Sequence, residues 1–209
     1  ALRQPPHAAR DREALADVLR QAEVALSTFD SLMKIAMAEA GIGAADLRVV
    51  DLSGTAADAA ELYEPVAEGR EIRLCVSTQP GAFVRAQPEL LAQAITNLID
   101  NAVKNTPSGG QIRVAVEARR SVVLLCVADT GRGIPEADRA RVLDRFVRLE
   151  ESRSTPGAGL GLALVSAVAR MHGARLSLED AAPGLRVTLR FPMAREPDLA
   201  ATGRAVASA

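Results

Sequence analysis

The 209-residue sequence has few aromatic residues and few histidines. Aromatic residues make up 2% of it and Trp is missing, which argues against a site that stacks on bases or sugars. Lys and Arg (25) balance Asp and Glu (26), so the net charge of -1 indicates no basic surface for nucleic acid. No run approaches the ~20 apolar residues of a membrane span. We therefore expect no contact of this chain with nucleic acid or with a membrane.

Cysteine is also scarce, because Cys75 and Cys126 are the two in the sequence. Both lie in apolar runs typical of strands, so we expect them to be buried as small hydrophobic residues. The sequence has neither a Cys-x-x-Cys pair nor a Cys/His cluster that would indicate a metal site. What it does have is 48% hydrophobic and 24% charged residues, enough for one globular domain with an appendage.

The N-terminal part of the sequence predicts one long helix. Residues 1–10 indicate a loop, because Pro5 and Pro6 disfavour helix there. Residues 11–40 follow with apolar side chains three and four apart, and Gly41 is a suitable C-terminal stop. The apolar stripe consists of Leu15, Val18, Leu19, Ala22, Leu26, Phe29, Leu32, Met33 and Ala36. One helix cannot bury its own stripe, so we expect it to self-associate or to pack on the rest of the chain.

Beyond Gly41 the sequence alternates between short strands and helices. The patterns predict strands at 49–52, 71–77, 82–85, 111–118, 121–128, 174–180 and 184–191. Helical spacing predicts helices at 53–68, 88–105 and 160–172, with a loop-rich stretch at 131–158. This order is typical of an α+β fold in which helices cover one face of a mixed sheet. Residues 194–209 are small and polar, and we expect a flexible tail.

The segment from Asn97 to Thr106 carries polar side chains on a helix that is otherwise apolar. Asn97, Asn101 and Lys104 share one helical face, because they are spaced as i, i+4 and i+7. An Asn amide oxygen suits Mg²⁺ that keeps water and phosphate oxygens as its other ligands. A lysine beside it can pair with phosphate as a point charge. A solvated polar face would show the same pattern, so this segment alone leaves both interpretations open.

A second segment runs from Val127 to Pro135, where an apolar strand leads directly into Asp129 and a Gly-x-Gly turn. A carboxylate at a strand end can accept a hydrogen bond from an exocyclic amino group such as that of adenine. Gly131 and Gly133 let the backbone approach a flat ring closely. An ordinary turn after a strand has similar residues, so the pattern is moderately specific.

A third segment, Pro156 to Leu162, places Gly157, Gly159 and Gly161 at alternate positions directly before a helical pattern. Backbone N–H groups in such a segment can bind phosphates at a helix N-terminus. A flexible hinge has the same composition. The stretch before it is polar rather than strand-like, and no Walker lysine follows, so neither the Rossmann nor the P-loop arrangement applies.

A fourth segment, residues 144–149, lies between the second and the third. Phe146 stands there in a polar neighbourhood, and we expect it to anchor a loop. Arg145, Arg148 and Arg153 could face phosphates, although solvated surface arginines have the same pattern.

In this order and spacing, the four segments resemble the N, G1, F and G2 boxes of bacterial sensor histidine kinases. The resemblance is to their catalytic ATP-binding domain, which belongs with the gyrase, Hsp90 and MutL ATPases, and it covers residues 47 to 193. It implies a two-layer α/β sandwich of the Bergerat type, with ATP between a helix layer and a mobile lid at residues 141–158. Residues 11–40 resemble, more weakly, the second helix of the dimerisation and phosphotransfer hairpin.

By this resemblance, ATP and Mg²⁺ bind along the four segments. Asn101 would be the Mg²⁺ ligand, Asn97 its polar neighbour, and Lys104 would contact phosphate. Asp129 would bind the adenine amino group. The backbone of the two glycine-containing segments would shape the adenine pocket and meet the triphosphate, through Gly131 and Gly133 and through Gly157, Ala158, Gly159, Leu160, Gly161 and Leu162.

The residue at position 97 distinguishes the branches of the wider family. The ATPase branches place a Glu one helical turn before the metal Asn, where it can activate water as a general base. Asn97 cannot take up a proton at neutral pH, so we expect water attack on ATP to be poorly catalysed. That outcome suits a kinase that keeps its phosphoryl group for a histidine.

Two departures from the family pattern stand out. An aromatic residue usually follows the Lys of the N box, and this chain has Asn105. The phosphoacceptor His, with an acidic neighbour and a Pro shortly after it, is also missing, since neither His7 nor His172 has that context. We therefore expect that the chain starts after the helix that carries the phosphoacceptor.

The expected organisation is a loop remnant at 1–10, a partial dimerisation helix at 11–41, an ATP-binding domain at 42–193 and a tail at 194–209. The resemblance implies transfer of the γ-phosphoryl group to a histidine outside this chain, then to an aspartate of a response regulator receiver domain. It implies a homodimeric parent, a cytoplasmic location for this part, and a parent that can be anchored in the inner membrane. Two alternatives stay open: a serine kinase of the anti-sigma-factor type, and a degenerate nucleotide-binding scaffold without catalysis.

Overall fold

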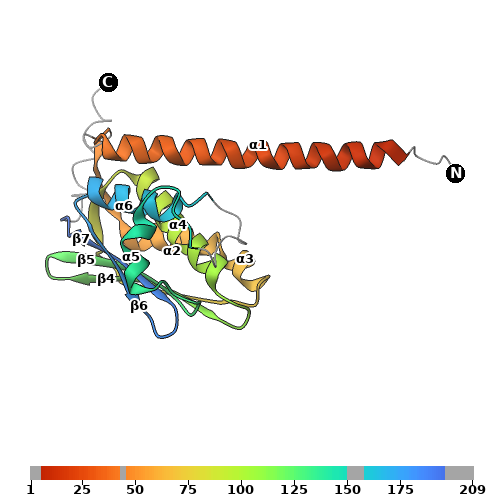
Figure 1. Ribbon diagram of the computed structural model, residues 1–209. Helices are drawn as coiled ribbons and strands as arrows, with labels where there is room; N and C mark the ends of the chain where they lie inside the picture. Colours follow the sequence, from red (N-terminus) through yellow and green to blue (C-terminus); the bar gives the residue numbers. More distant parts are fainter. Residues whose placement is uncertain (1–5, 43–45, 150–157, 196–209) are drawn as a thin grey trace, which may run out of the picture.

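The computed structural model describes residues 6–42, 46–149 and 158–195, with side chains from residue 14 onward. A long helix, α1 (Pro6–Glu39), precedes a domain of helices and strands and extends beyond it at its N-terminal end (Figure 1). The loop predicted for residues 1–10 is wrong from Pro6 on, because the helix begins at that residue. Proline is tolerated in the first turn of a helix, where its missing N–H would have no partner within the helix.

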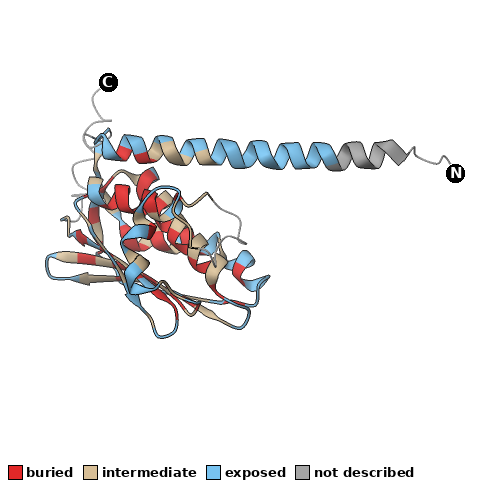
Figure 2. Ribbon diagram, viewed as in Figure 1, coloured by how far each residue is buried: buried red, intermediate tan, exposed pale blue. Residues whose placement is uncertain are grey.

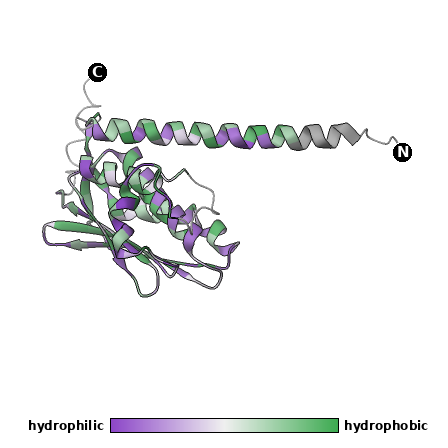
Figure 3. Cartoon of the chain, in the orientation of Figure 1, coloured by the Kyte–Doolittle hydropathy of each residue, from purple (hydrophilic) through white to green (hydrophobic). Residues whose placement is uncertain are grey.

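Helix α1 contacts the domain through its C-terminal turns. Ile35 and Ala38 are buried and Leu32 is half-buried against the core, which includes α6 (Gly161–Met171). The predicted packing of this helix on the rest of the chain is therefore confirmed for its last turns. The described part of the helix before them is largely exposed, although hydrophobic bands continue along it (Figures 2 and 3). Over the whole described part of α1, the large exposed hydrophobic residues are Leu15, Val18, Leu19, Val24, Leu26, Phe29, Met33 and Met37.

The domain is built on a five-stranded mixed sheet in the order β2-β4-β5-β7-β6, with a separate β1-β3 pair. β2 and β4 run parallel, and all other neighbouring strands are antiparallel. The α+β prediction is thereby confirmed. The strands are β1 (Arg48–Asp51), β2 (Arg73–Thr78), β3 (Phe83–Ala86), β4 (Gln111–Arg119), β5 (Val122–Asp129), β6 (Arg175–Asp180) and β7 (Leu185–Pro192).

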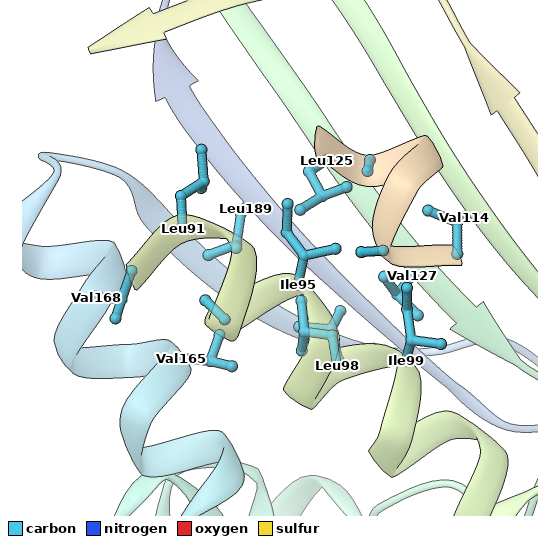
Figure 4. Packing of buried hydrophobic residues seen from close by; sticks show 14 of the residues in the cluster. Leu91, Ile95, Leu98, Ile99, Val114, Leu125, Val127, Val165, Val168 and Leu189 are labelled. Atoms are coloured by element: carbon cyan, nitrogen blue, oxygen red, sulfur yellow. The ribbon is translucent and has the colours of Figure 1, made fainter. Parts of the chain in front are cut away.

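Helices α2 (Leu52–Glu61), α4 (Pro88–Asn105) and α6 lie on one face of this sheet (Figure 1). Side chains of β5 alternate between buried on this face and half-buried on the other, as the period of two in a strand requires. Figure 4 shows Leu125 and Val127 of β5 in the same buried cluster as Ile95 and Ile99 of α4. Each fully buried aliphatic side chain contributes about 1.5–3 kcal/mol, so this layer holds α4 firmly against the sheet.

Cys75 of β2 and Cys126 of β5 lie on the opposite face of the sheet and are half-buried, so the prediction that both are buried is wrong. The strand assignment was right, but these two side chains point away from the helices that cover the other face. Burial nevertheless raises the pKa of the Cys126 thiol, although a hydrogen bond with the Thr188 side chain acts in the opposite direction.

Two predicted elements differ in detail. The helix predicted at 53–68 is split into α2 and α3 (Glu64–Glu68), because Pro65 lacks the N–H that a continuous helix needs. The loop-rich stretch after β5 contains α5 (Glu136–Arg139) and the 3₁₀ helix η2 (Arg141–Leu143). Eight residues of the predicted lid, 150–157, and the predicted tail from 196 on lie outside the described residues. Within the described residues, no helix is long and apolar enough to span a membrane.

Candidate functional site

A cleft with a volume of about 640 Å³ opens between α4, the turn after β5, the N-terminal end of α6 and one side of α1. Gly131 is buried within that turn, and Gly157 lies outside the described residues. The structure thus brings distant segments together, as the sequence predicted. The predicted residues that line the cleft are Asn97, Asn101, Lys104, Asp129, Gly133, Ala158, Gly159, Leu160, Gly161 and Leu162.

Helix α4 presents its polar face to the cleft and its apolar face to the sheet. Leu91, Ile95 and Leu98 are buried in the core. Asn97 and Asn101 are half-buried in the wall of the cleft. Because core packing fixes the rotation of the helix, it also fixes the direction in which these two amides project.

Lys104 has a partner that the sequence reasoning missed. Its Nζ donates to Oδ2 of Asp100, one helical turn earlier, at 2.6 Å. The i, i+4 spacing of opposite charges was a signal that could have revealed this pair. A phosphate group that approaches Lys104 would therefore either share its ammonium group with the Asp100 carboxylate or displace that carboxylate. The same carboxylate lies near Tyr63, and burial together with Asp100 raises the pKa of that phenol to about 12.

Asp129 ends β5 and is 5% exposed, so it forms a buried acceptor in the cleft wall. Its Oδ1 accepts hydrogen bonds from the backbone N–H groups of Gly131, at 2.8 Å, and Leu185, at 3.4 Å. Burial raises the pKa of this carboxyl, and the two backbone hydrogen bonds partly offset that effect. The contact with Leu185 was not predicted, because it arises from the pairing of β5 with β7, which no local motif shows.

Close backbone packing around Asp129 requires glycine at two neighbouring positions. A Cβ added to Gly131 would lie 2.4 Å from the carbonyl oxygen of Asn105, at the end of α4. A Cβ added to Gly184 would lie 1.8 Å from the carbonyl oxygen of Asp129. Gly184 also has a φ of +103, which other residues rarely adopt. The sequence pattern predicts Gly184 only as the first residue of a strand, and it does not reveal this packing against Asp129.

The third predicted segment leads directly into α6. Gly159 has a φ of +70, and its carbonyl oxygen accepts the N–H of Phe146 at 3.1 Å. Gly161 begins α6, and a Cβ added there would lie 4.0 Å from the Cβ of Asn97. The N-terminal turn of α6, with backbone N–H groups that a helix leaves unpaired at this end, is therefore beside the polar face of α4.

The fourth segment behaves differently from the prediction. The Phe146 residue is 59% exposed, so its side chain does not anchor the loop by burial. Its backbone N–H does donate a hydrogen bond to the carbonyl oxygen of Gly159. Arg145 pairs with Glu39 of α1, and Arg148 lines the cleft. Arg153 lies outside the described residues.

Helix α1 forms one side of the cleft. Two sets of contacts hold it there: Lys34 donates to Gln93 of α4 at 3.2 Å, and Glu39 accepts from Arg145 and Arg170. The sequence did not show this position, because amphipathic spacing indicates that a helix packs but not against which surface. The α1 residues that line the cleft are Val24, Ser27, Thr28, Asp30 and Ser31.

His172 is buried with both ring nitrogens engaged. Nε2 accepts the backbone N–H of Gln87 at 2.8 Å, which leaves the proton on Nδ1, 2.8 Å from the carbonyl oxygen of Val168. Burial lowers the pKa of this imidazole, which is therefore neutral at pH 7. His172 thus links the end of α6 to the start of α4, as a structural residue rather than a phosphoacceptor. His7 lies in the first turn of α1, where side chains are not described.

The donor atoms in the cleft suit Mg²⁺ that arrives with phosphates. No group of three His, Cys, Asp or Glu side chains able to hold a metal ion is found among the described residues. Asn101 offers one amide oxygen, whose direction is fixed by a hydrogen bond from Nδ2 of Asn105 at 3.2 Å. An amide oxygen has two lone pairs, so one remains for a cation. Mg²⁺ takes such sparse protein ligation together with phosphate oxygens and water.

Comparison with known proteins identifies the family to which the residues of this cleft belong. Residues 86–195, which supply all of the described cleft apart from α1, match the family described as Histidine kinase-, DNA gyrase B-, and HSP90-like ATPase. The chain belongs to this family. The resemblance of the four segments is thereby confirmed at the level of the family, while the roles of single residues in the cleft stay predictions.

Relatives of the chain are named as sensor proteins and sensor histidine kinases. Sensor protein IrlS of Burkholderia pseudomallei is 37% identical over 150 residues, which are 70% of this chain and 32% of IrlS. The structure of the mycobacterial sensor histidine kinase MprB is 31% identical, with a TM-score of 0.62 over 72% of this chain and 99% of that chain. Full-length ShkA in complex with AMPPNP is 29% identical, with a TM-score of 0.72 over 90% of this chain and 40% of that chain.

These relatives confirm the two-layer sandwich and support neither the serine kinase nor the degenerate scaffold. The chain spans about a third of the length of IrlS. The activity and partners of a whole sensor protein therefore come to this chain as a proposal.

Proposed function

We propose that this chain is the ATP- and Mg²⁺-binding kinase core of a two-component sensor histidine kinase. In this proposal it passes the γ-phosphoryl group of ATP to a histidine outside the chain, and from there the group goes to an aspartate of a response regulator receiver domain. The observation that carries the proposal is the cleft that Asp129, Asn101, Gly159 and Gly161 line together. Family membership and the sensor kinases among the relatives support it.

The residues of the cleft offer contacts to the adenine, to the phosphates and to the Mg²⁺ ion that accompanies them. Asp129 accepts a hydrogen bond from the adenine amino group, in a pocket shaped by the turn from Gly131 to Gly133. The backbone N–H groups of Gly159 to Leu162 receive the phosphates at the start of α6. Asn101 binds Mg²⁺, which supplies neutralisation of phosphate charge, and Lys104 adds a second positive charge. The ShkA complex with AMPPNP supports a nucleotide of this kind in the related cleft.

Asn97 favours phosphoryl transfer to a side chain over hydrolysis. It lies beside the glycine segment, within 4.0 Å of where a Cβ on Gly161 would be. Its amide cannot accept a proton from water at neutral pH, so a water molecule there gains no general base. Replacement of Asn97 by Glu should leave ADP affinity largely intact and change the rate of ATP turnover. A variant that loses ADP binding to the same extent as turnover would contradict this role.

The transfer step can be tested with a separate helical hairpin that carries a phosphoacceptor histidine, supplied as its own polypeptide. We expect γ-³²P-ATP to label the hairpin when Mg²⁺ and this chain are present, and the label to be acid-labile, as a phosphoramidate is. An Asn101→Ala variant should give no label. Acid-stable label on a hydroxyl would favour the serine kinase, and nucleotide binding without any transfer would favour the scaffold.

The remaining assignments also belong to this proposal. Helix α1 would be the second helix of the dimerisation and phosphotransfer hairpin, consistent with its exposed hydrophobic side chains. Residues 42–193 would be the ATP-binding domain, with residues 141–158 as its lid. The parent would be a homodimer that presents this part to the cytoplasm from an inner-membrane anchor, and the response regulator would receive the phosphoryl group there.

A further inference from the structure

A hydrogen-bonded chain of side chains crosses the C-terminal end of α4. Nδ2 of Asn105 donates to the backbone carbonyl oxygen of Asn101 at 2.7 Å and to its side-chain Oδ1 at 3.2 Å. Nη2 of Arg132, in the turn after β5, donates to Oδ1 of Asn105 at 3.0 Å. All three residues line the cleft, so the chain leads from that turn to the proposed Mg²⁺ ligand.

The chemistry of these groups fixes the orientation of both amides. A guanidinium group has donors and no acceptor, so Arg132 requires the oxygen of the Asn105 amide to face it. The NH₂ group of Asn105 then faces Asn101 and requires an oxygen there. Without the NH₂ group of Asn105, the amide of Asn101 is free to turn about its last side-chain bond, because that torsion is broad and roughly two-fold. Half of those orientations would present an NH₂ group to a cation.

The backbone of Asn105 provides a second link in the same place. Its carbonyl oxygen is the atom against which Gly131 packs, since a Cβ on Gly131 would lie only 2.4 Å away. The N–H of Gly131 in turn donates to Oδ1 of Asp129 at 2.8 Å. Asn105 therefore lies between the residue proposed to bind adenine and the residue proposed to bind the metal.

We infer that Asn105 is a positioning residue for Mg²⁺: it holds the side-chain oxygen of Asn101 toward the cation, and Arg132 sets its orientation. The inference rests on the proposed function, because it needs a nucleotide with Mg²⁺ in this cleft. A residue of this kind affects the binding of the metal-bound nucleotide more than that of the nucleotide alone. That difference separates a positioning role from a general effect on the fold.

The test is calorimetric titration of ADP with and without Mg²⁺, and the quantity compared is the ratio of the two dissociation constants. Asn105→Leu keeps the approximate volume and removes the donor and the acceptor. We expect it to reduce the effect of Mg²⁺ on affinity by about three- to tenfold, the net value of one hydrogen bond. Its metal-free affinity should stay within about twofold of wild type. Asn101→Ala gives the reference for complete loss of the Mg²⁺ effect.

Arg132→Ala is a second variant, at an exposed side chain whose loss the fold should tolerate. Arg132→Ala should reduce the effect of Mg²⁺ on ADP affinity, as Asn105→Leu does. The double variant should show no further reduction beyond that of Asn105→Leu alone. Arg132→Ala keeps the inference testable if Asn105→Leu fails to fold, which thermal melting shows.

The outcomes separate this inference from the proposed function. If wild type shows Mg²⁺-dependent binding and both variants keep its ratio of dissociation constants, the inference is overturned and the proposed function stands. Equal weakening of binding with and without Mg²⁺ in Asn105→Leu would mean a structural role and would also overturn the inference. A wild-type chain that does not bind ADP at all would overturn the proposed function itself.

Discussion

Replacement of Gly131 by Ala should impair nucleotide binding through a steric effect alone. A Cβ at this position would lie 2.4 Å from the carbonyl oxygen of Asn105 and 2.8 Å from Oδ1 of Asp129. The first of these atoms is backbone at the end of α4, which the core packing of the helix holds in place. The turn after β5 must therefore move away from α4, and the carboxyl of Asp129 must move with it.

The magnitude follows from two separate effects. Overpacking of this kind costs about 1–3 kcal/mol of unfolding free energy. The displaced carboxyl would also lose the hydrogen bond that we propose it forms with adenine, and a loss of about 1.4 kcal/mol corresponds to about tenfold weaker binding. Backbone strain does not contribute, because Gly131 is not one of the glycines with positive φ. ADP affinity should thus fall by about tenfold or more in a chain that is still folded.

Gly109 provides the matched control. It has a φ of +79, but a Cβ added there would meet nothing within 4 Å. Gly109→Ala should therefore cost about 1–2 kcal/mol through its left-handed backbone, without any effect on ADP affinity. Urea unfolding and calorimetric ADP titration of both variants give the comparison. A Gly131→Ala variant with wild-type affinity, or equal loss of affinity in both variants, would refute the steric reasoning.

Three further predictions concern the contacts that hold the layers together. Burial lowers the pKa of His172, so below about pH 6.5 the unfolded chain takes up a proton that the folded chain resists. The neutral imidazole therefore contributes its full stability above that pH, and the contribution is lost as pH falls through the lowered folded pKa. The urea midpoint of wild type should fall over this pH range, and His172→Asn should flatten that slope. Ile35→Ala, at a fully buried position, should cost about 2–5 kcal/mol and speed hydrogen exchange in the last turns of α1, whereas Met33→Ala at an exposed position should stay within about 0.5 kcal/mol in urea unfolding. Glu39→Gln should cost less than about 1 kcal/mol because its ion pairs are partly exposed, and the difference from wild type in thermal melting should shrink as salt is raised.

The parts of the site that the sequence predicted are those encoded within one element. Asn97 and Asn101 share a face because four residues make about one helical turn, and the structure has them in one wall of the cleft. Asp129 follows an apolar run, so its place at a strand end could be predicted from its neighbours. The glycines before α6 were recognisable from their spacing and from the helical pattern that follows.

The parts that the sequence did not predict depend on contacts between distant elements. The N–H of Leu185 reaches Asp129 only because β7 pairs with β5, and no property of residue 185 indicates that. The hydrogen bond from Arg132 to Asn105 joins a turn to a helix end 27 residues earlier. The position of α1 at the cleft likewise depends on which surface receives Ile35, and hydrophobic spacing does not specify the receiving surface. The helix start at Pro6 could not be predicted for a local reason. Proline disfavours the interior of a helix but is accepted in the first turn, and the sequence around Pro6 does not show which case applies.

The most direct test of the central claim is calorimetric titration of wild type and Asp129→Asn with ADP and a non-hydrolysable ATP analogue, each with and without Mg²⁺. Asp129→Asn keeps the size of the side chain and removes the charge of the buried acceptor. The account predicts that wild type binds both nucleotides, that Mg²⁺ strengthens binding, and that Asp129→Asn weakens it by at least about tenfold. A wild-type chain that binds neither nucleotide, or an Asp129→Asn variant with unchanged affinity, would contradict the assignment of this cleft to ATP.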